Sequence, residues 1–317
     1  MKIIFLGTPE FAVPALLKLI ESNHTVVGVV TKPDKPVGRS NKPVFSPVKK
    51  LAIKHNIPVF QFKILNSGVV ESLKILNADI MITCAFGQIL PVEILNLTSY
   101  GVFNIHGSIL PKYRGASPIQ WAIINGEEKT GITILKSDTG IDTGKILLTK
   151  TITIKKYETY GELAIRLADL SAEAIIEGLK LIESNTKLTE QNHELATVCK
   201  IFTKDAGKLD FNKNAEEVVN TIHGLNPSPL AYFEYDNSRF KVYRAKHSNI
   251  ELLERNNLTD INSFQNGEIV VAKPKQGLII KCNDGFVSIL EIQAESGKAM
   301  DIKNFLNGKQ FKENVIL

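Results

Sequence analysis

Short apolar runs alternate with amphipathic helical patterns through the first half of the chain, and this alternation constrains the fold more than any other feature. Residues 2–6 and 25–31 indicate buried strands, with a helix predicted over 11–22 between them. Two apolar strands joined by a helix are typical of a parallel sheet covered by helices. The alternation continues through strands predicted at 58–61, 79–85, 102–105, 131–136 and 145–154, and helices at 46–55, 67–76, 91–95 and 116–125. We therefore expect a Rossmann-like, doubly wound parallel sheet.

The turn after the first strand reads Gly7-Thr8-Pro9-Glu10-Phe11. It lacks the second and third glycines of the GxGxxG fingerprint that cradles a dinucleotide pyrophosphate. A dinucleotide site is therefore poorly supported, and we expect this sheet to bind another kind of ligand.

The stretch 101–121, GVFNIHGSILPKYRGASPIQW, begins as a strand and then changes abruptly to loop residues. Asn104 and His106 stand two apart at this change, so on an extended backbone their side chains leave from the same face. An amide donor and a titratable imidazole can then converge on one small group. Taken alone, such a pair more often merely caps the end of a strand.

A second polar loop, SDTGIDTG over 137–144, follows the strand predicted at 131–136. Two aspartates and two glycines predict either a tight turn or a carboxylate presented on a loop hinged by glycines. Ligands of open α/β sheets gather at the carboxyl ends of strands. We expect the loops after Ile105 and Lys136 to lie there together, over one pocket.

The C-terminal half has a different pattern. A long helix is predicted over 162–183, followed by a polar segment and a short helix over 215–223. Short strands are then expected at 230–235, 239–245, 267–272, 277–282 and 285–292, separated by turn residues. This pattern favours a small β-barrel, OB-like. We expect an N-terminal α/β domain over 1–187, a linker over 188–206 and the β-barrel domain over 207–317.

Several classes of protein are disfavoured. The start resembles neither a secretory signal nor a transit segment, and no apolar run is long enough to span a membrane. Cys84, Cys199 and Cys282 lie far apart without a CxxC, which argues against a disulfide framework and against a zinc site. We expect a cytoplasmic monomer without a membrane partner.

The motifs together resemble the formyltransferases that use 10-formyltetrahydrofolate, and among them the methionyl-tRNA formyltransferases. The resemblance covers essentially the whole length. The matching segments are Gly7-Thr8-Pro9, KPDKPVGR at 32–39, SPVK at 46–49, NIHGSILP at 104–111, RGASPIQ at 114–120, DTGIDTG at 138–144, GKAM at 297–300 and FLNG at 305–308. One departure is Asn226-Pro227-Ser228-Pro229-Leu230, where the family usually has Asn-Pro-Trp-Pro-Gly.

The resemblance implies Asn104, His106 and Asp142 as catalytic residues. Formyl transfer from N10 of the folate to a primary amine passes through a tetrahedral oxyanion, and the amine must lose protons. Asn104 and the His106 imidazolium would donate to that oxyanion, where one donor is worth about 10²- to 10³-fold in rate. Asp142 would keep His106 charged and orient it, and would relay the proton from the amine. No metal and no covalent intermediate are required.

The resemblance also implies the residues that contact the folate. The turn formed by Ser108, Ile109, Leu110 and Pro111 is similar to the family's folate-contacting turn, and the segment 86–90 would wall the pterin through Phe86, Gln88, Ile89 and Leu90. For residues 86–90 an ordinary apolar loop between strand and helix is an equal alternative.

The positive charge is concentrated in residues 32–54. Seven basic residues against Asp34 give +6, whereas the whole chain is +5; they are Lys32, Lys35, Arg39, Lys42, Lys49, Lys50 and Lys54. The prolines and glycine of its first part predict a protruding loop. The loop resembles the one with which the family grips the tRNA acceptor stem, which implies Lys35, Arg39 and Lys42 as tRNA contacts. A merely solvated loop is the alternative.

The expected activity is transfer of the formyl group of 10-formyltetrahydrofolate to initiator methionyl-tRNA, for translation initiation. The alternative is a formyltransferase acting on a small amine, such as glycinamide ribonucleotide or an amino sugar nucleotide, which would share the catalytic domain. The C-terminal half should discriminate, because the sugar enzyme is expected to carry a second dehydrogenase-like sheet there. A binding protein without enzymatic activity is a third possibility, and would not need Asn104, His106 and Asp142.

Overall fold

The computed structural model describes residues 1–36, 43–65, 67–203, 205–248, 254 and 261–317. The chain divides into two compact units. Unit 1 comprises Met1–Pro118, Lys129–Ile152 and Ala164–Cys199, and unit 2 comprises Ile119–Glu128, Thr153–Leu163 and Lys200–Leu317. The chain therefore passes between the units more than once.

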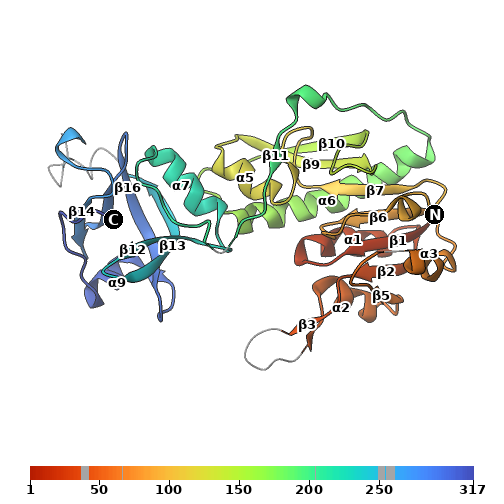
Figure 1. The fold of residues 1–317 in the computed structure, drawn as a ribbon, viewed down its shortest axis with the longest axis horizontal. Helices are drawn as coiled ribbons and strands as arrows, with labels where there is room; N and C mark the ends of the chain where they lie inside the picture. The colour runs from red at the N-terminus through yellow and green to blue at the C-terminus, as the bar shows by residue number, and fades with distance from the viewer. Residues whose placement is uncertain (37–42, 66, 204, 249–253, 255–260) are drawn as a thin grey trace. The chain divides into compact units, whose positions relative to one another are not determined.

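Unit 1 is built on a seven-stranded sheet with the order β10-β9-β7-β6-β1-β2-β5 (Figure 1). The strands are β1 (Lys2–Gly7), β2 (Thr25–Thr31), β5 (Val59–Gln61), β6 (Ile80–Cys84), β7 (Val102–His106), β9 (Lys129–Lys136) and β10 (Ile146–Thr153). All neighbours from β5 to β7 pair in parallel. The predicted Rossmann-like fold class is confirmed.

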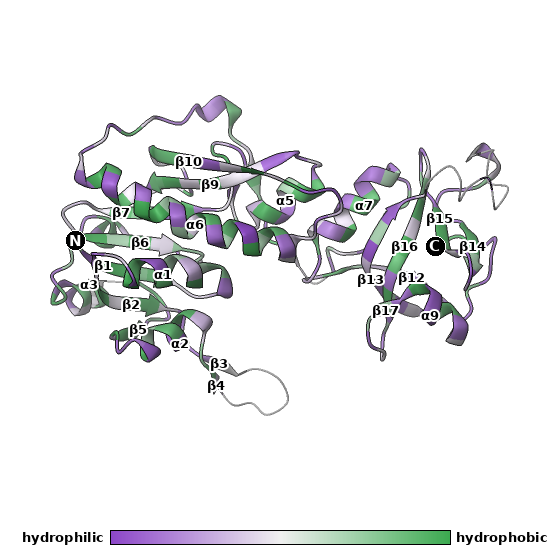
Figure 2. Ribbon diagram, turned by 180° about the vertical axis from the view of Figure 1, so that it is seen from behind, coloured by the Kyte–Doolittle hydropathy of each residue, from purple (hydrophilic) through white to green (hydrophobic). Residues whose placement is uncertain are grey.

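Helices lie between successive strands along the chain from β1 to β9, and one long helix follows β10, the last strand of this sheet. They are η1 (Glu10–Ala12), α1 (Val13–Ile20), α2 (Pro47–Lys54), α3 (Ser67–Lys74), α4 (Val92–Leu95), α5 (Pro118–Ile124) and the long α6 (Tyr160–Glu183). The Ser46 hydroxyl caps α2 by accepting from the Lys49 N–H, and Pro47 occupies its first turn. The central strands are apolar on both faces, as Figure 2 shows for β6, because both faces are covered.

Strand β9 departs from the parallel pattern. It pairs antiparallel with β7, so Lys136 at its end lies opposite Phe103 near the start of β7. The expectation that the loops after Ile105 and Lys136 both leave from the carboxyl ends of parallel strands is therefore wrong. The segment 137–145 instead runs back along β7: the Ser137 N–H donates to the Val102 carbonyl, and residues beyond it reach the level of His106.

Unit 2 contains an antiparallel sheet with the order β12-β13-β16-β15-β14, which confirms the predicted C-terminal β domain. Its strands are β12 (Ala231–Tyr235), β13 (Ser238–His247), β14 (Ile269–Lys273), β15 (Gly277–Lys281), β16 (Phe286–Ala294) and β17 (Met300–Asp301), the last paired with β16. Helices α7 (Ala215–Gly224) and α9 (Ile302–Gly308) contribute Val219, Ile222 and Phe305 to the core beneath the sheet. The sequence did not predict α9.

The remaining elements are short. They are β3 (Lys35–Pro36) with β4 (Pro43–Val44), β8 (Arg114–Gly115) with β11 (Val198–Cys199), and the 3-10 turns η2 (His193–Leu195) and η3 (Ile261–Ser263). Within the described ranges no helix is long and apolar enough to cross a membrane.

Candidate active site

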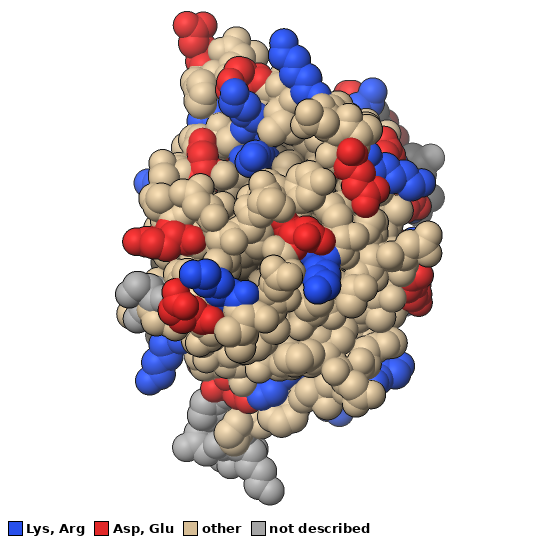
Figure 3. Space-filling view, turned by 90° about the vertical axis from the view of Figure 1, so that its right-hand side faces the viewer, with Lys and Arg blue, Asp and Glu red and all other residues tan. Residues whose placement is uncertain are grey.

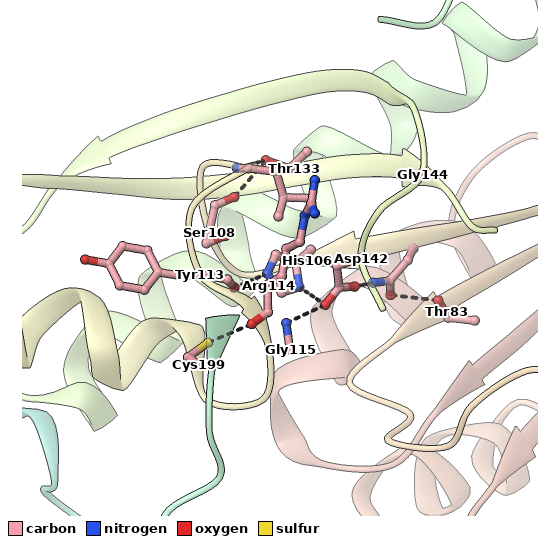
Figure 4. A network of polar contacts seen from close by, with 12 residues as sticks. Thr83, His106, Ser108, Tyr113, Arg114, Gly115, Thr133, Asp142, Gly144 and Cys199 are labelled. Carbon is pink, nitrogen blue, oxygen red and sulfur yellow. Dashed lines mark hydrogen bonds and ion pairs between the residues drawn. The ribbon is translucent and has the colours of Figure 1, made fainter. Parts of the chain in front are cut away.

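Strand β7 carries Asn104 and His106 near its carboxyl end, and Figure 4 shows His106 beside Asp142 there. His106 is only 5% exposed, while Asn104 is partly accessible. The spacing of two residues on an extended backbone is what places the two side chains together.

Asp142, on the segment 137–145, contacts both of these residues. Its Oδ1 accepts from Asn104 Nδ2 at 3.0 Å, and its Oδ2 accepts from the Gly115 N–H at 2.8 Å. Oδ2 also lies 3.4 Å from His106 Nδ1. The structure thus brings together the three residues expected to be catalytic, and their roles in catalysis stay a prediction.

The His106 ring lies between two acceptors. Its Nε2 is 2.8 Å from the Tyr113 carbonyl oxygen, and its Nδ1 faces the Asp142 carboxylate. Both acceptors are oxygen atoms, so each ring nitrogen faces a group that accepts a hydrogen bond but cannot donate one.

Thr83 of β6 is a site residue that the sequence reasoning missed. Its hydroxyl donates to Asn104 Oδ1 at 2.7 Å, which leaves the amide nitrogen toward Asp142. One Nδ2 hydrogen then goes to Asp142 and the second remains for a ligand. Thr83 follows an apolar run, and no pattern in the sequence marks it because its partner lies on the neighbouring strand.

The folate-contacting turn predicted over 108–111 is tightly bonded. Ser108 is fully buried and donates to the Lys112 carbonyl at 2.7 Å. Thr133 Oγ1 donates to the Ser108 carbonyl at 2.7 Å and accepts from the Leu110 N–H at 3.3 Å. Leu110 is buried, whereas Ile109 and Pro111 are partly exposed. The parts of this turn open to a ligand are therefore Ile109 and Pro111.

The segment 86–90 has mixed surroundings. Phe86 is buried in the core beside β1 and β6, and Leu90 packs against the same cluster. Gln88 donates to the Phe62 carbonyl at 3.2 Å, whereas Ile89 is 76% exposed. Of these four predicted pterin contacts, Ile89 offers the largest free apolar surface.

The predicted tRNA-contacting loop is only partly described. Arg39 and Lys42 lie outside the described residues, and the backbone of Lys35 pairs with Val44 in the β3–β4 hairpin. Further along, Lys49 Nζ is 2.5 Å from Asp34 Oδ2, and this hydrogen bond lowers the pKa of the Asp34 carboxyl. Lys49 is therefore neutralised locally.

On the face of the molecule in Figure 3, Lys and Arg side chains are interspersed with Asp and Glu. Within the described part of the chain, no group of three or more His, Cys, Asp or Glu could hold a metal ion.

Comparison with known proteins covers both units. A family model described as formyl transferase matches residues 1–179, and one described as formyl transferase, C-terminal domain, matches 201–310. The methionyl-tRNA formyltransferase of Clostridioides difficile (strain 630) is 41% identical over 319 residues, covering 100% of each chain. The methionyl-tRNA formyltransferase from Clostridium thermocellum matches with a TM-score of 0.54 and 21% identity, covering 79% of this chain and 95% of that one.

The sugar 3N-formyl transferase WlaRD, solved in the presence of dTDP and 5-N-formyl-THF, also shares the fold. It matches with a TM-score of 0.65 and 20% identity, covering 94% of this chain and 99% of that one. The architecture of the C-terminal half therefore does not separate the two substrate classes, and the discriminator expected from the sequence is wrong. The full-length sequence identity does separate them, and the chain belongs to the methionyl-tRNA formyltransferase family.

Proposed function

We propose that the chain transfers the formyl group of 10-formyltetrahydrofolate to the amino group of initiator methionyl-tRNA, giving formylmethionyl-tRNA for translation initiation in the cytoplasm. One observation carries the proposal beyond family membership. The Asp142 carboxylate is bonded to Asn104 and lies beside His106, at the edge of the sheet where α/β enzymes bind ligands.

The chemistry assigns a distinct task to each side chain. The amine nitrogen attacks the formyl carbon, and negative charge develops on the formyl oxygen. The second Nδ2 hydrogen of Asn104, which Thr83 and Asp142 leave free, is oriented to bind that oxygen. The C–N10 bond then breaks, N10 takes a proton, and the amine loses one.

His106 and Asp142 would act on charge and protons. Both His106 nitrogens are engaged in this structure, so the ring donates to the oxyanion only by exchanging the Asp142 or Tyr113 acceptor. Asp142 keeps an acceptor beside the reacting amine and balances the imidazolium charge. None of these steps uses a metal.

Substrate binding is assigned to separate surfaces of the same unit. The folate would contact Ile109 and Pro111 of the 108–111 turn and the exposed Ile89. The tRNA would contact Lys35, Arg39 and Lys42, since the net +6 of residues 32–54 suits a phosphate backbone. We expect the enzyme to act as a monomer.

A parallel transfer assay tests this function. Purified chain and 10-formyltetrahydrofolate are offered methionyl-tRNA, free methionine, glycinamide ribonucleotide and a nucleotide-linked amino sugar, with Asp142→Asn as a control of strongly reduced turnover. Formylation should occur with methionyl-tRNA and be slow with free methionine. A preference for the ribonucleotide or the amino sugar would overturn the proposal.

A further inference from the structure

The polar segment over 185–199, called here the return segment, contains one deeply buried glutamine. Gln191 is 5% exposed, although Glu190 and Asn192 on either side of it are exposed. Burying an amide costs free energy unless its hydrogen-bonding groups are satisfied. A glutamine that is buried between exposed neighbours therefore has a specific set of partners.

Gln191 uses all of its hydrogen-bonding capacity on the active-site loops. Its Nε2 donates to the carbonyl oxygens of Asp142 at 2.8 Å and Gly144 at 2.7 Å. Its Oε1 accepts from Arg114 Nε at 3.1 Å and Nη2 at 2.7 Å. Since carbonyls only accept and a guanidinium only donates, the amide has a single orientation that satisfies these partners.

These bonds fix two chain segments that meet at the Asp142 carboxylate. Asp142 has a φ of 53°, in the left-handed region, so its backbone is held in a conformation that a non-glycine residue adopts at a cost. The neighbour of Arg114 is Gly115, whose N–H donates to Asp142 Oδ2. Gln191 therefore holds both the backbone that carries the carboxylate and the backbone that donates to it.

The return segment also supports His106. Thr197 Oγ1 accepts from the Tyr113 N–H at 2.8 Å, and the Thr197 carbonyl accepts from the Arg114 N–H at 2.8 Å. The Tyr113 carbonyl in turn holds the His106 ring. This second anchor is mostly made by backbone groups, whereas Gln191 acts through its side chain and is open to mutation.

We propose that Gln191 is a positioning residue for Asp142 and that it sets the rate of formyl transfer without contacting either substrate. The inference rests on the proposed function. A carboxylate displaced by about 1 Å from the reacting groups can cost about 10²-fold in rate. Loss of the Gln191 amide should therefore lower kcat and leave substrate binding nearly intact.

Two variants distinguish the contribution of the Gln191 donor, Nε2, from that of its acceptor, Oε1. Gln191→Met keeps the bulk and removes every hydrogen bond. Gln191→Glu keeps the acceptor for Arg114 and removes the donors to Asp142 and Gly144. Asn192→Ala is the matched control, because Asn192 lies on the same segment and its side chain only caps η2 by accepting from the Glu194 N–H.

The expected result is a fall in kcat of about 10- to 100-fold in both Gln191 variants, with KM for folate and methionyl-tRNA within about threefold of the parent. In an Asp142→Asn background the further loss from Gln191→Met should be small, because both changes act on one group. Asn192→Ala should behave as the parent. Full kcat in Gln191→Glu, or losses that multiply in the double variant, would overturn the proposal.

Amide hydrogen exchange supplies a readout that does not depend on activity. Exchange over residues 138–144 should rise in Gln191→Met while exchange in β1 and β6 stays at the parental rate. Unchanged exchange in that loop would refute the positioning role even if the parent proved inactive with methionyl-tRNA. An inactive parent with the expected exchange pattern would instead refute only the proposed function.

Discussion

The Thr83 hydroxyl donates to Asn104 Oδ1 at 2.7 Å, and this bond, together with the one from Asn104 Nδ2 to Asp142 Oδ1, fixes the orientation of the Asn104 amide. Without the Thr83 bond only Asp142 would oppose a rotation of the amide by 180° about χ2, since its oxygen and nitrogen ends have nearly the same shape. The rotated amide would place its oxygen toward Asp142, where two acceptors would repel each other.

Thr83→Val should therefore lower kcat by about 10-fold with little change in KM, because the donor to the oxyanion is no longer held in one orientation. Valine has nearly the shape of threonine, so the buried strand should keep its packing and lose only about 1 kcal/mol of stability. Thr83→Ser, which keeps the hydroxyl, is the control. Steady-state kinetics and thermal unfolding of both variants check the prediction, and equal kcat in Val and Ser variants would contradict it.

His106→Ala and Asp142→Ala should each remove most turnover, about 10²- to 10⁴-fold, because both residues act on the transition state. Folate binding should stay within about threefold of the parent. The double variant should lose far less than the product of the two single losses, since the side chains are 3.4 Å apart and share one task. Single-turnover rates and folate titrations provide the measurement, and fully multiplicative losses would show that the two residues act independently.

Arg39→Ala should raise the KM for methionyl-tRNA and reduce its salt dependence by about one counterion, while folate affinity stays unchanged. The reason is the sequence-based assignment of Arg39 to phosphate contacts. Lys18→Ala is the control, because Lys18 is an exposed cation on α1, outside the basic segment 32–54. KM measured across a salt series tests this, together with trypsin cleavage at Arg39 and Lys42 with and without tRNA. Equal trypsin cleavage with and without tRNA, together with an unchanged salt dependence of KM, would show that the basic segment 32–54 is only a solvated surface.

Stability of unit 2 should fall as the pH drops through the acid range because of His223. This residue of α7 is 2% exposed, and burial lowers its pKa from 6.5 to about 4, with Arg244 and His247 acting in the same direction and Glu162 opposing them. The unfolded chain binds a proton near pH 6.5, while folded His223 stays neutral until about pH 4. The free energy of unfolding should therefore decrease across this window, by about 3 kcal/mol at most.

Denaturant titrations followed by fluorescence of Trp121, the single tryptophan and part of unit 2, would measure this loss. His223→Gln should flatten the dependence between pH 6.5 and 4 even if it lowers stability overall. His55→Gln, which removes an exposed histidine of unit 1, should not. An identical slope in the parent and His223→Gln would show that other groups govern the acid range.

The order of elements followed from the sequence because it depends on local patterns. Apolar runs and period-3.6 faces predicted the strands at 25–31 and 80–84 and the helix α6 to within two residues at each end. The pairing of Asn104 with His106 also followed, since it needs only two residues on one strand. Their union with Asp142 came from motif order and family resemblance, and the strand-direction argument offered for it was wrong.

The sequence marked Leu230 as unusual but did not show which backbone conformation this residue adopts. Leu230 stands where the family usually has glycine, and its φ of 75° lies in the left-handed region that glycine adopts freely. The leucine side chain is buried, so packing offsets the backbone cost of that conformation. Leu230 therefore has the left-handed conformation that a glycine would adopt freely, and its side chain packs in the interior.

The sequence by itself determined the α/β alternation, the C-terminal β domain and the residue types available for formyl transfer. Only the tertiary structure decided that β9 runs antiparallel, that 137–145 returns along β7, and that Thr83 bonds to the Asn104 side chain and Gln191 to the Asp142 backbone. The physical reason is the range of the interactions. Periodicity and turn chemistry act within a few residues, whereas the bond from Thr83 to Asn104 spans 21 residues and that from Gln191 to Asp142 spans 49, and such bonds exist only after the sheet has formed.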